Sequence, residues 1–277
     1  MTYRLICDSC TDLPPEILPD PHITKVPLSI QVGPETVVDD ETFRQGELLQ
    51  KMRAWPDAPK TACPAPSAYL DMFLEEGDSY VVTLSGQLSG SYNAAMQARA
   101  IYREEGGKGN VHVFNSRSAS AGQTQIALLV RELAGRGLPF AQVVERVEAY
   151  IGRMRTLFVL ENLDNLRKNG RLTRMQSLVT GALRVKLVMG STPQGEIMRH
   201  GQALSIKQAL NKLCAIMSAD ERHRGQLLCI SHCLCRERAE YLRALAFKTC
   251  DFADVRIEET RGISSFYANS GGIVAAY

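Results

Sequence analysis

The sequence predicts an α/β fold with two α/β domains, and two observations lead to this prediction. Short apolar segments of strand length alternate with longer segments whose apolar residues recur at helical spacing. This alternation is typical of a parallel sheet covered by helices. The 277 residues also suffice for two modest domains. We therefore expect an N-terminal domain over residues 1–155, with a mainly parallel sheet and an excursion around 22–60, and a C-terminal domain over 156–277.

The individual elements follow from the same patterns. The segments expected to form strands are residues 4–7, 26–32, 80–84, 111–114, 157–160, 227–231 and 255–257. The segments expected to form helices are residues 41–54, 68–75, 92–104, 123–134, 141–154, 206–217 and 237–247. In one of these helices Val143, Val147 and Ile151 recur every four residues. A β-hairpin is expected in the C-terminal domain, where residues 185–189 pair with 196–199.

Composition and charge exclude several classes of protein. Lys and Arg number 32 against 30 Asp and Glu, so the strong basic excess of a nucleic-acid-binding scaffold is missing. No apolar run reaches the eighteen residues of a membrane-spanning helix, and we expect no stable membrane insertion. Asp8 comes too early for a signal peptide. The eight cysteines are scattered, and a reducing cytoplasm is the simplest setting for them.

The most informative segment follows the expected strand at residues 80–84. It is a loop that holds Ser85, Ser89, Gly90 and Ser91 and leads directly into a helix. Hydroxyls and free backbone N–H groups at a helix N-terminus form a site for an anion. Glycine lets the backbone approach such an anion closely.

Three more loops rich in hydroxyls follow apolar segments. They cover residues 8–12, 61–67 and 115–122, and they include Ser9 and Ser120. Each loop by itself is compatible with simple helix capping. Because ligands of parallel α/β sheets bind beyond the carboxyl ends of the strands, we expect the four loops to form a polar rim around one shared cleft.

No familiar catalytic or metal motif accompanies these loops. Cys7 and Cys10 have redox spacing, but two prolines delay any helix behind them, so we interpret the spacing as incidental. The cysteines between residues 229 and 235 lack a second cluster that would complete a zinc site. A nucleophile elbow, a dinucleotide fingerprint and a Walker loop are also missing. We expect no catalytic residue and no metal.

A basic segment at residues 167–174 has two interpretations. It is either a solvated surface turn or a source of positive charge for an anionic ligand or a partner. Arg171 stands just past the bend at Asn169 and Gly170. We favour a functional role for this arginine.

Seven segments together resemble a known family. They cover residues 7–14, 26–30, 61–66, 84–93, 115–122, 163–173 and 271–277. In this order they resemble the DegV proteins, a family of bacterial fatty-acid-binding proteins, over nearly the whole chain. The resemblance implies two α/β domains that enclose one long-chain fatty acid in a cleft between them. It also implies a carrier that is not itself an enzyme and that presents the acid to a separate fatty acid kinase for phospholipid synthesis.

The resemblance further implies which residues bind the ligand. Thr61 and Ser89 match the positions that hold the carboxylate in the family, and Arg171 matches a family arginine. The expected fatty-acid-binding residues are Thr61, Ser89, Gly90, Ser91, Ser9, Ser120, Arg171 and Tyr267. No cofactor is expected besides the bound fatty acid.

Two positions depart from the family pattern. Many members have a histidine near the C-terminus where this chain has Tyr267 as the nearest counterpart. Carrier members also tend to have an arginine in the segment where this chain has Leu204. In the family both positions are linked to phosphoryl transfer or to kinase contact. We expect fatty acid binding to survive both departures, which bear instead on coupling to a kinase.

Two other functions are compatible with the same loops. One is a phosphotransferase or hydrolase acting on a small phosphorylated or acyl substrate, which would use the loops to hold an anion. The other is a lipid-responsive docking module that engages a partner through the basic segment at residues 167–174.

Overall fold

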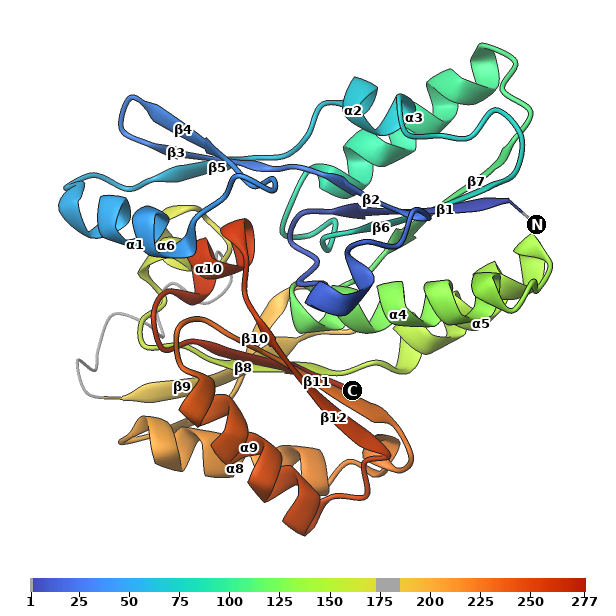
Figure 1. The fold of residues 1–277 in the computed structure, drawn as a ribbon. Coiled ribbons are helices and arrows are strands. Elements are labelled where there is room, and N and C mark those ends of the chain that lie inside the picture. Colours follow the sequence, from blue (N-terminus) through green and yellow to red (C-terminus); the bar gives the residue numbers. More distant parts are fainter. Residues whose placement is uncertain (1, 173–184) are drawn as a thin grey trace.

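The computed structural model describes residues 2–172 and 185–277. Its N-terminal part is built on a four-stranded sheet with the order β2-β1-β6-β7 (Figure 1). The strands are β1 (Tyr3–Asp8), β2 (Ile23–Val26), β6 (Asp78–Thr83) and β7 (Asn110–Asn115). Each neighbouring pair runs parallel. The predicted parallel sheet is confirmed.

Helices cover both faces of this sheet (Figure 1). One face packs against α2 (Pro66–Leu70) and α3 (Ser91–Glu104), and the other against α4 (Ala121–Gly135) and α5 (Phe140–Arg153). Successive side chains of a strand point to opposite faces, so β1 contributes to both cores. In the middle of the sheet, Tyr80, Val81 and Val82 of β6 are apolar in succession and fully buried, as is typical of parallel sheets covered on both faces.

A small antiparallel sheet with the order β4-β3-β5 extends from one end of the parallel sheet (Figure 1). Its strands are β3 (Ser29–Val32), β4 (Glu35–Val38) and β5 (Lys60–Ala62), and α1 (Gln45–Ala54) lies between β4 and β5 in the chain. This sheet carries Thr61, and it is the excursion that the sequence predicts around residues 22–60.

One predicted strand is wrong. Residues 26–32 form two strands in two different sheets, with β2 ending at Val26 and β3 beginning at Ser29. Pro27 lies between them and has no N–H to donate to a continuing ladder. The N–H of Leu28 binds the side chain of Ser9 instead, at 3.0 Å.

The C-terminal part contains a six-stranded sheet with the order β10-β9-β8-β13-β11-β12. Its strands are β8 (Thr156–Val159), β9 (Lys186–Ser191), β10 (Ile197–Ala203), β11 (Leu227–His232), β12 (Asp254–Glu259) and β13 (Ile273–Ala276). Only β11 and β12 pair in parallel. The predicted hairpin is confirmed as β9 and β10.

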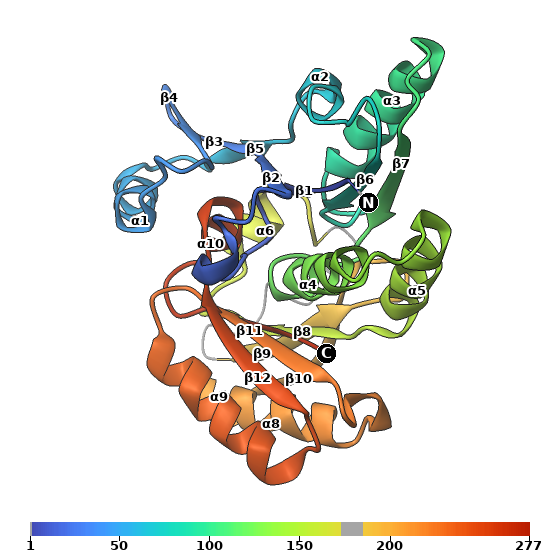
Figure 2. The ribbon, with the colours of Figure 1, turned by 45° about the vertical axis from the view of Figure 1, so that its right-hand side comes forward.

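One face of the six-stranded sheet packs against α8 (Ile206–Ser218) and α9 (Arg236–Thr249). The other face turns toward the N-terminal part, where α4 packs against both large sheets (Figure 2). The domain limits at residues 155 and 156 stay a prediction.

Two short helices that the sequence does not predict reach across between the parts. They are α6 (Asp164–Lys168) and α10 (Gly262–Ala268), and α10 packs against α1, β3 and α6. Single 3₁₀ turns occur at Pro15–Ile17 and Glu221–His223. The five longer predicted helices after residue 90 are confirmed. The helix expected over 68–75 is shorter, at Pro66–Leu70, and the one expected from residue 41 begins at Gln45.

Candidate ligand-binding cavity

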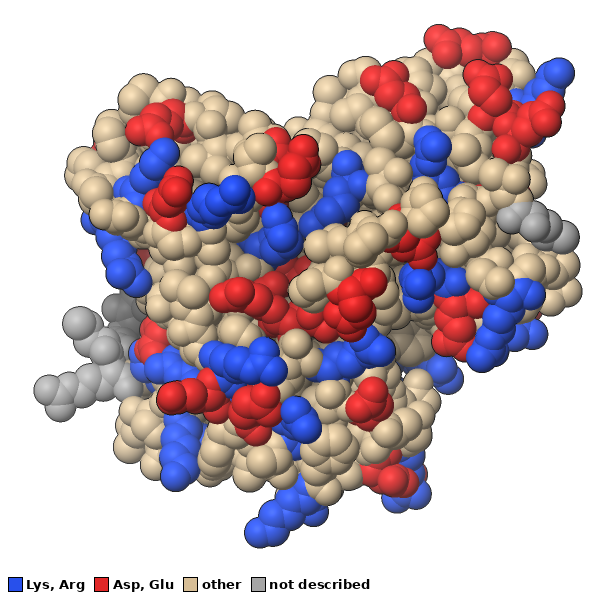
Figure 3. All heavy atoms as spheres, viewed as in Figure 1, with Lys and Arg blue, Asp and Glu red and all other residues tan. Residues whose placement is uncertain are grey.

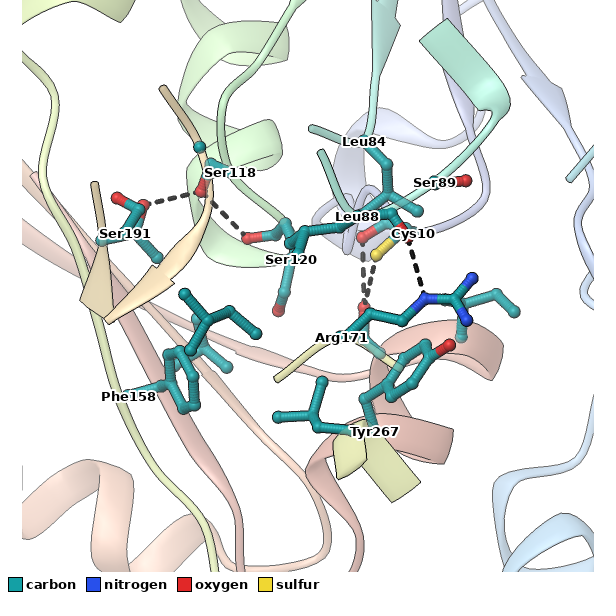
Figure 4. A pocket seen from close by; sticks show the side chains of 18 of the residues that line it. Cys10, Leu84, Leu88, Ser89, Ser118, Ser120, Phe158, Arg171, Ser191 and Tyr267 are labelled. Atoms are coloured by element: carbon teal, nitrogen blue, oxygen red, sulfur yellow. Dashed lines mark hydrogen bonds between the residues drawn. The ribbon is translucent and has the colours of Figure 1, made fainter. Parts of the chain in front are cut away.

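A cavity of about 320 Å³ lies between the two parts of the molecule (Figure 4). Its volume falls within the range of small-molecule sites. The apolar side chains that line it come from both parts: Leu28, Leu84, Leu88, Phe158, Leu160, Leu166, Ile197, Ile263 and Val274. The cavity is therefore suited to a ligand with an apolar portion.

Polar side chains gather at one end of the cavity. The hydroxyls of Thr61 and Tyr267 lie 3.0 Å apart and share a hydrogen bond. Arg171 donates from Nε to the carbonyl oxygen of Leu88 at 3.0 Å, which places its guanidinium beside the Ser89 loop. Figure 4 shows Ser89, Arg171 and Tyr267 together on one side of the cavity. This end offers hydroxyl donors and one positive charge.

Local structure explains how these residues meet. Thr61 lies on β5, opposite Ile30 of β3, at the start of the segment that leads to α2. Ser89 and Gly90 precede α3. A Cβ on Gly90 would stand 2.8 Å from the Sγ of Cys63, so a larger residue at this position would require the Cys63 side chain to move.

The electrostatics of this end keep the Tyr267 phenol neutral. Burial raises the pKa of Tyr267, while the hydrogen bond shared with Thr61 and the nearby charge of Arg171 act in the opposite direction. Because a phenol already has a pKa near 10 in water, the raised value leaves Tyr267 protonated at neutral pH. Tyr267 is thus a hydrogen-bond donor without a charge.

Two buried carboxylates behind the cavity wall hold the hydroxyl-rich loops in place through hydrogen bonds. Asp8 accepts hydrogen bonds from the N–H of Leu84 at 2.6 Å and from Nε2 of Gln123 at 2.8 Å. Asp12 accepts from the hydroxyl of Ser120 at 2.5 Å and from the N–H of Arg261 at 2.8 Å. Asp12 thereby ties the N-terminal part to the residue before α10.

Burial affects both of these carboxyl groups. It raises the pKa of Asp8 to about 6 and that of Asp12 to about 6, although hydrogen bonds from their partners act against the increase. A third carboxylate, Asp39, accepts from the N–H groups of Gly262 and Ile263, both at 3.0 Å. Burial also raises the pKa of Asp39. These contacts set the position of α10, which carries Tyr267.

The opposite end of the cavity is closed by the tip of the β9–β10 hairpin. The hydroxyl of Ser85 donates to the carbonyl oxygen of Gly195 at 2.8 Å. Ser118 and Thr156 share a hydrogen bond of 2.6 Å, which satisfies their hydroxyls with each other. Figure 4 shows Ser118 and Phe158 across the cavity from Tyr267.

The structure brings six of the eight predicted site residues to the cavity wall. These are Thr61, Ser89, Gly90, Ser120, Arg171 and Tyr267. Ser9 and Ser91 do not line the cavity, contrary to the expected position. The Ser9 hydroxyl accepts from the N–H of Leu28, and the Ser91 hydroxyl lies 3.0 Å from that of Ser89. Both serines therefore lie behind the wall, where they support it. Residues 173 and 174 of the basic segment lie outside the described residues.

Sequence reasoning predicted Tyr267 but missed the contributions of the hairpin tip and of the first turn of α10. Gly195 and Glu196 from the hairpin and Ile263 and Ser264 from α10 all line the cavity. The sequence predicts the hairpin, but it does not predict the part of the molecule against which the hairpin tip packs. The segment of α10 is seven residues long and carries no helical repeat that would reveal it.

The cysteines are all free thiols. Burial raises the pKa of Cys7 to about 12, so this thiol is far from the thiolate form that redox chemistry requires. Within residues 2–172 and 185–277, no three His, Cys, Asp or Glu side chains are close enough to hold a metal ion. In the same ranges no helix combines the length and the apolar character needed to cross a bilayer.

Comparison with known proteins places the chain in a family. The family described as "Uncharacterised protein, DegV family" matches residues 2–276. The chain belongs to the DegV family. A DegV domain-containing protein of Streptococcus pneumoniae (strain ATCC BAA-255 / R6) is 34% identical over 289 residues, which covers 100% of this chain and 99% of the relative.

Solved structures of DegV proteins share the fold, and several of them are described with a fatty acid. A DegV family protein of Ruminococcus gnavus, described with vaccenic acid, is 44% identical with a TM-score of 0.95, and 99% of each chain is covered. The fatty acid kinase (Fak) B3 protein of Streptococcus pneumoniae, loaded with linoleic acid, is 31% identical with a TM-score of 0.91, covering 100% of this chain and 99% of that one. A protein of Eubacterium eligens loaded with heptadecanoic acid is 27% identical with a TM-score of 0.91, and 99% of each chain is covered.

Proposed function

We propose that this protein binds one long-chain fatty acid, with the tail in the cavity and the carboxylate between Thr61 and Ser89. The observation that carries the proposal is that apolar side chains from both parts line the cavity, while Ser89, Arg171 and Tyr267 lie together on one side of it, with Thr61 hydrogen-bonded to Tyr267. The fatty acids named for the Ruminococcus, Eubacterium and Streptococcus structures support it.

The tail and the head group of the fatty acid contribute to binding in different ways. Burying a tail of about fourteen to eighteen carbons at about 0.8 kcal/mol per CH₂ is worth on the order of 10 kcal/mol before association costs. The tail therefore supplies most of the affinity. A buried carboxylate without new partners would cost on the order of several kcal/mol even after the protein relaxes, so the head group needs the donors at the polar end.

Each residue of the polar end has a distinct role in this proposal. Ser89 and Thr61 donate hydrogen bonds to the carboxylate oxygens, and Arg171 balances the negative charge. When Tyr267 donates its proton to Thr61, the Thr61 hydroxyl keeps its own proton for the ligand. These roles require donors but no general base, so we assign the chain as a carrier and not as an enzyme.

The carrier role includes a partner. The Streptococcus pneumoniae relative is named as the B3 protein of a fatty acid kinase, and we propose that this chain likewise presents its fatty acid to a kinase subunit for phospholipid synthesis. We place this activity in the cytoplasm, where the eight free thiols are stable.

Native mass spectrometry of the purified protein tests the binding proposal. We expect one adduct with the mass of a fatty acid, lost on organic extraction and restored by palmitate or oleate. The double variant Thr61→Ala, Ser89→Ala should bind about 100-fold more weakly, because it loses two hydrogen bonds to a charged group.

A matched control removes two exposed hydroxyls away from the cavity, with Thr36→Ala and Ser67→Ala, and should leave the affinity unchanged. A delipidated protein that takes up neither acid contradicts the proposal. Turnover of ATP or of an acyl phosphate by the isolated chain contradicts the assignment as a carrier without enzymatic activity.

A further inference from the structure

A second cavity, of about 270 Å³, shares no lining residue with the first. Its wall comes from residues 13, 15 and 18 around the first 3₁₀ turn, from residues 43–45 at the start of α1, and from residues 258–261 at the end of β12. Both parts of the molecule therefore contribute to it. Its volume is close to the lower limit of about 300 Å³ for ligand sites, so the cavity suits a small molecule.

Glu258 lines this cavity with a carboxyl group that has no partner. Its exposed fraction is 9%, and it takes part in no hydrogen bond or ion pair with the residues that the structure describes. Ser231 lies opposite Glu258 on β11, yet its buried hydroxyl also has no partner among the described residues. Arg256 of the same strand pairs with Glu16 at 3.0 Å. Because a buried carboxyl group without partners is unfavourable, its place on a cavity wall indicates a ligand that donates to it.

Arg261 brings a positive charge to the same cavity. Its Nη2 donates to the carbonyl oxygen of Asp40 at 3.2 Å, and its buried Nε has no hydrogen-bond partner in the described part of the chain. Within residues 2–172 and 185–277, the side chains of Arg261 and Glu258 form no ion pair, with each other or with any other residue. The cavity therefore has an unpaired group of each charge.

The rest of the wall is largely apolar. Leu13 and Phe43 are buried, and Leu18 is partly exposed at the opening. Arg44 and Gln45 also line the cavity, but both donate to nearby carbonyl oxygens. The cavity thus combines two unpaired groups of opposite charge with an apolar surface.

We propose that this cavity binds a free α-amino acid with an apolar side chain, such as leucine. The ammonium group of the ligand donates to Glu258, and its carboxylate accepts from Arg261. The side chain of the ligand packs against Leu18 and Phe43. A ligand with a single charge leaves one of the two protein groups unpaired, so a zwitterion fits this cavity better than an amine or an acid.

Isothermal titration calorimetry with three ligands tests the proposal on the unaltered protein. Leucine carries both charges, leucine methyl ester lacks the carboxylate, and N-acetylleucine lacks the ammonium group. We expect leucine to bind at least about tenfold more tightly than either derivative, because each derivative leaves one protein charge without a partner. Equal binding of leucine and either derivative, or no binding of leucine, overturns the proposal.

The variant Glu258→Gln removes the charge of the carboxyl group and keeps its size. We expect the affinity for leucine to fall about tenfold and that for N-acetylleucine to stay unchanged, since the latter has no ammonium group to lose a partner. The matched control is Glu105→Gln, at an exposed position outside the cavity, which should leave both affinities unchanged. A leucine affinity in Glu258→Gln that equals the wild-type value contradicts the assigned pairing.

The pH dependence of leucine binding separates this pairing from a purely structural role. Burial raises the pKa of Glu258 to about 7, and the like charges of Glu16 and Asp12 act in the same direction. Arg256 and Arg236 act against the increase. Because the ammonium group pairs with the ionised carboxyl group, the affinity for leucine should rise about tenfold from pH 6 to pH 8 in the wild type. A flat profile in the wild type, or the same rise in Glu258→Gln, overturns the proposal.

Discussion

Buried carboxylates at single positions organise the loops of the cavity. Asp8 ends β1 and Asp12 lies in the segment that follows, and both are fully buried although the sequence predicts only a polar loop over residues 8–12. Their oxygens accept hydrogen bonds from N–H and O–H groups of segments far along the chain, including Ser120 and Arg261. The cavity wall therefore depends on groups that never touch the ligand.

Asp12 makes the stability of the protein depend on pH. Burial raises its pKa from 3.8 to about 6, so between these values the folded state binds the proton more tightly than the unfolded state. This contribution to stability is therefore largest in acid and falls as pH rises toward 6, by about 3 kcal/mol in all.

The variant Asp12→Asn lacks this titration. We expect the free energy of unfolding of the wild type, minus that of the variant, to decrease as pH rises from 4.5 to 6.5. Urea unfolding at four pH values measures this difference. A difference that stays constant or rises with pH would contradict the assigned direction.

At the scale of elements, the β9–β10 hairpin closes the cavity through one glycine. Gly195 has φ +89, and a Cβ there would stand 2.3 Å from the Ser85 oxygen and 2.7 Å from Cα of Arg117. The hairpin can dock against the Ser85 loop only because this Cβ is missing. A backbone contact of this kind depends on position and not on side-chain chemistry.

Gly195→Ala should therefore push the hairpin tip away from the cavity. We expect a loss of about 1–3 kcal/mol in the free energy of unfolding beyond that of Gly106→Ala, and faster release of bound fatty acid. Gly106 is the matched control, because its φ is +84 and nothing lies within 4 Å of its Cβ position. Urea unfolding and stopped-flow release of a fluorescent fatty acid measure the two effects; equal behaviour of the variants would contradict the docking role.

At the scale of the whole molecule, α4 joins the two sheets. Gln125 donates from Nε2 to the carbonyl oxygens of Leu227 at 2.7 Å and Ala276 at 2.5 Å, both in the six-stranded sheet. Its Oε1 accepts from the hydroxyl of Tyr150 at 2.5 Å. The contacts of α4 thus add specific hydrogen bonds to the packing between the parts.

On the face shown in Figure 3, acidic and basic side chains are interspersed over both parts of the molecule.

Gln125→Ala should weaken this junction and leave three buried polar groups without their partner. We expect a loss of about 2–4 kcal/mol in the free energy of unfolding, with both parts still unfolding in one transition. The control is Gln142→Ala on the exposed side of α5, where we expect a change within about 0.5 kcal/mol. Urea unfolding followed by circular dichroism and by tyrosine fluorescence tests this; two separate transitions, with only one shifted by the variant, would contradict it.

Most of the regular elements could be predicted because their signals are local. The four-residue repeat of Val143, Val147 and Ile151 defines α5 without reference to the rest of the chain. The exceptions have tertiary causes. At Pro27 the chain leaves the parallel sheet and enters the small antiparallel sheet. The start of α10 is stabilised by a hydrogen bond to Asp39, which no pattern in the sequence of α10 itself predicts.

The sequence by itself determined the α/β alternation and the hydroxyl-rich loops at strand ends, and its resemblance to a known family indicated the residues of the polar end. The alternation and the loops could be predicted because they depend on short-range periodicity and on the common edge of the sheet at which parallel strands end. Only the tertiary structure decided that Ser9 and Ser91 stand behind the cavity wall and that the hairpin tip and α10 complete it. Those outcomes depend on contacts between distant segments, such as Asp12 with Arg261 across 249 positions. No local pattern encodes a contact of that kind, because its partners become neighbours only when both sheets pack around α4.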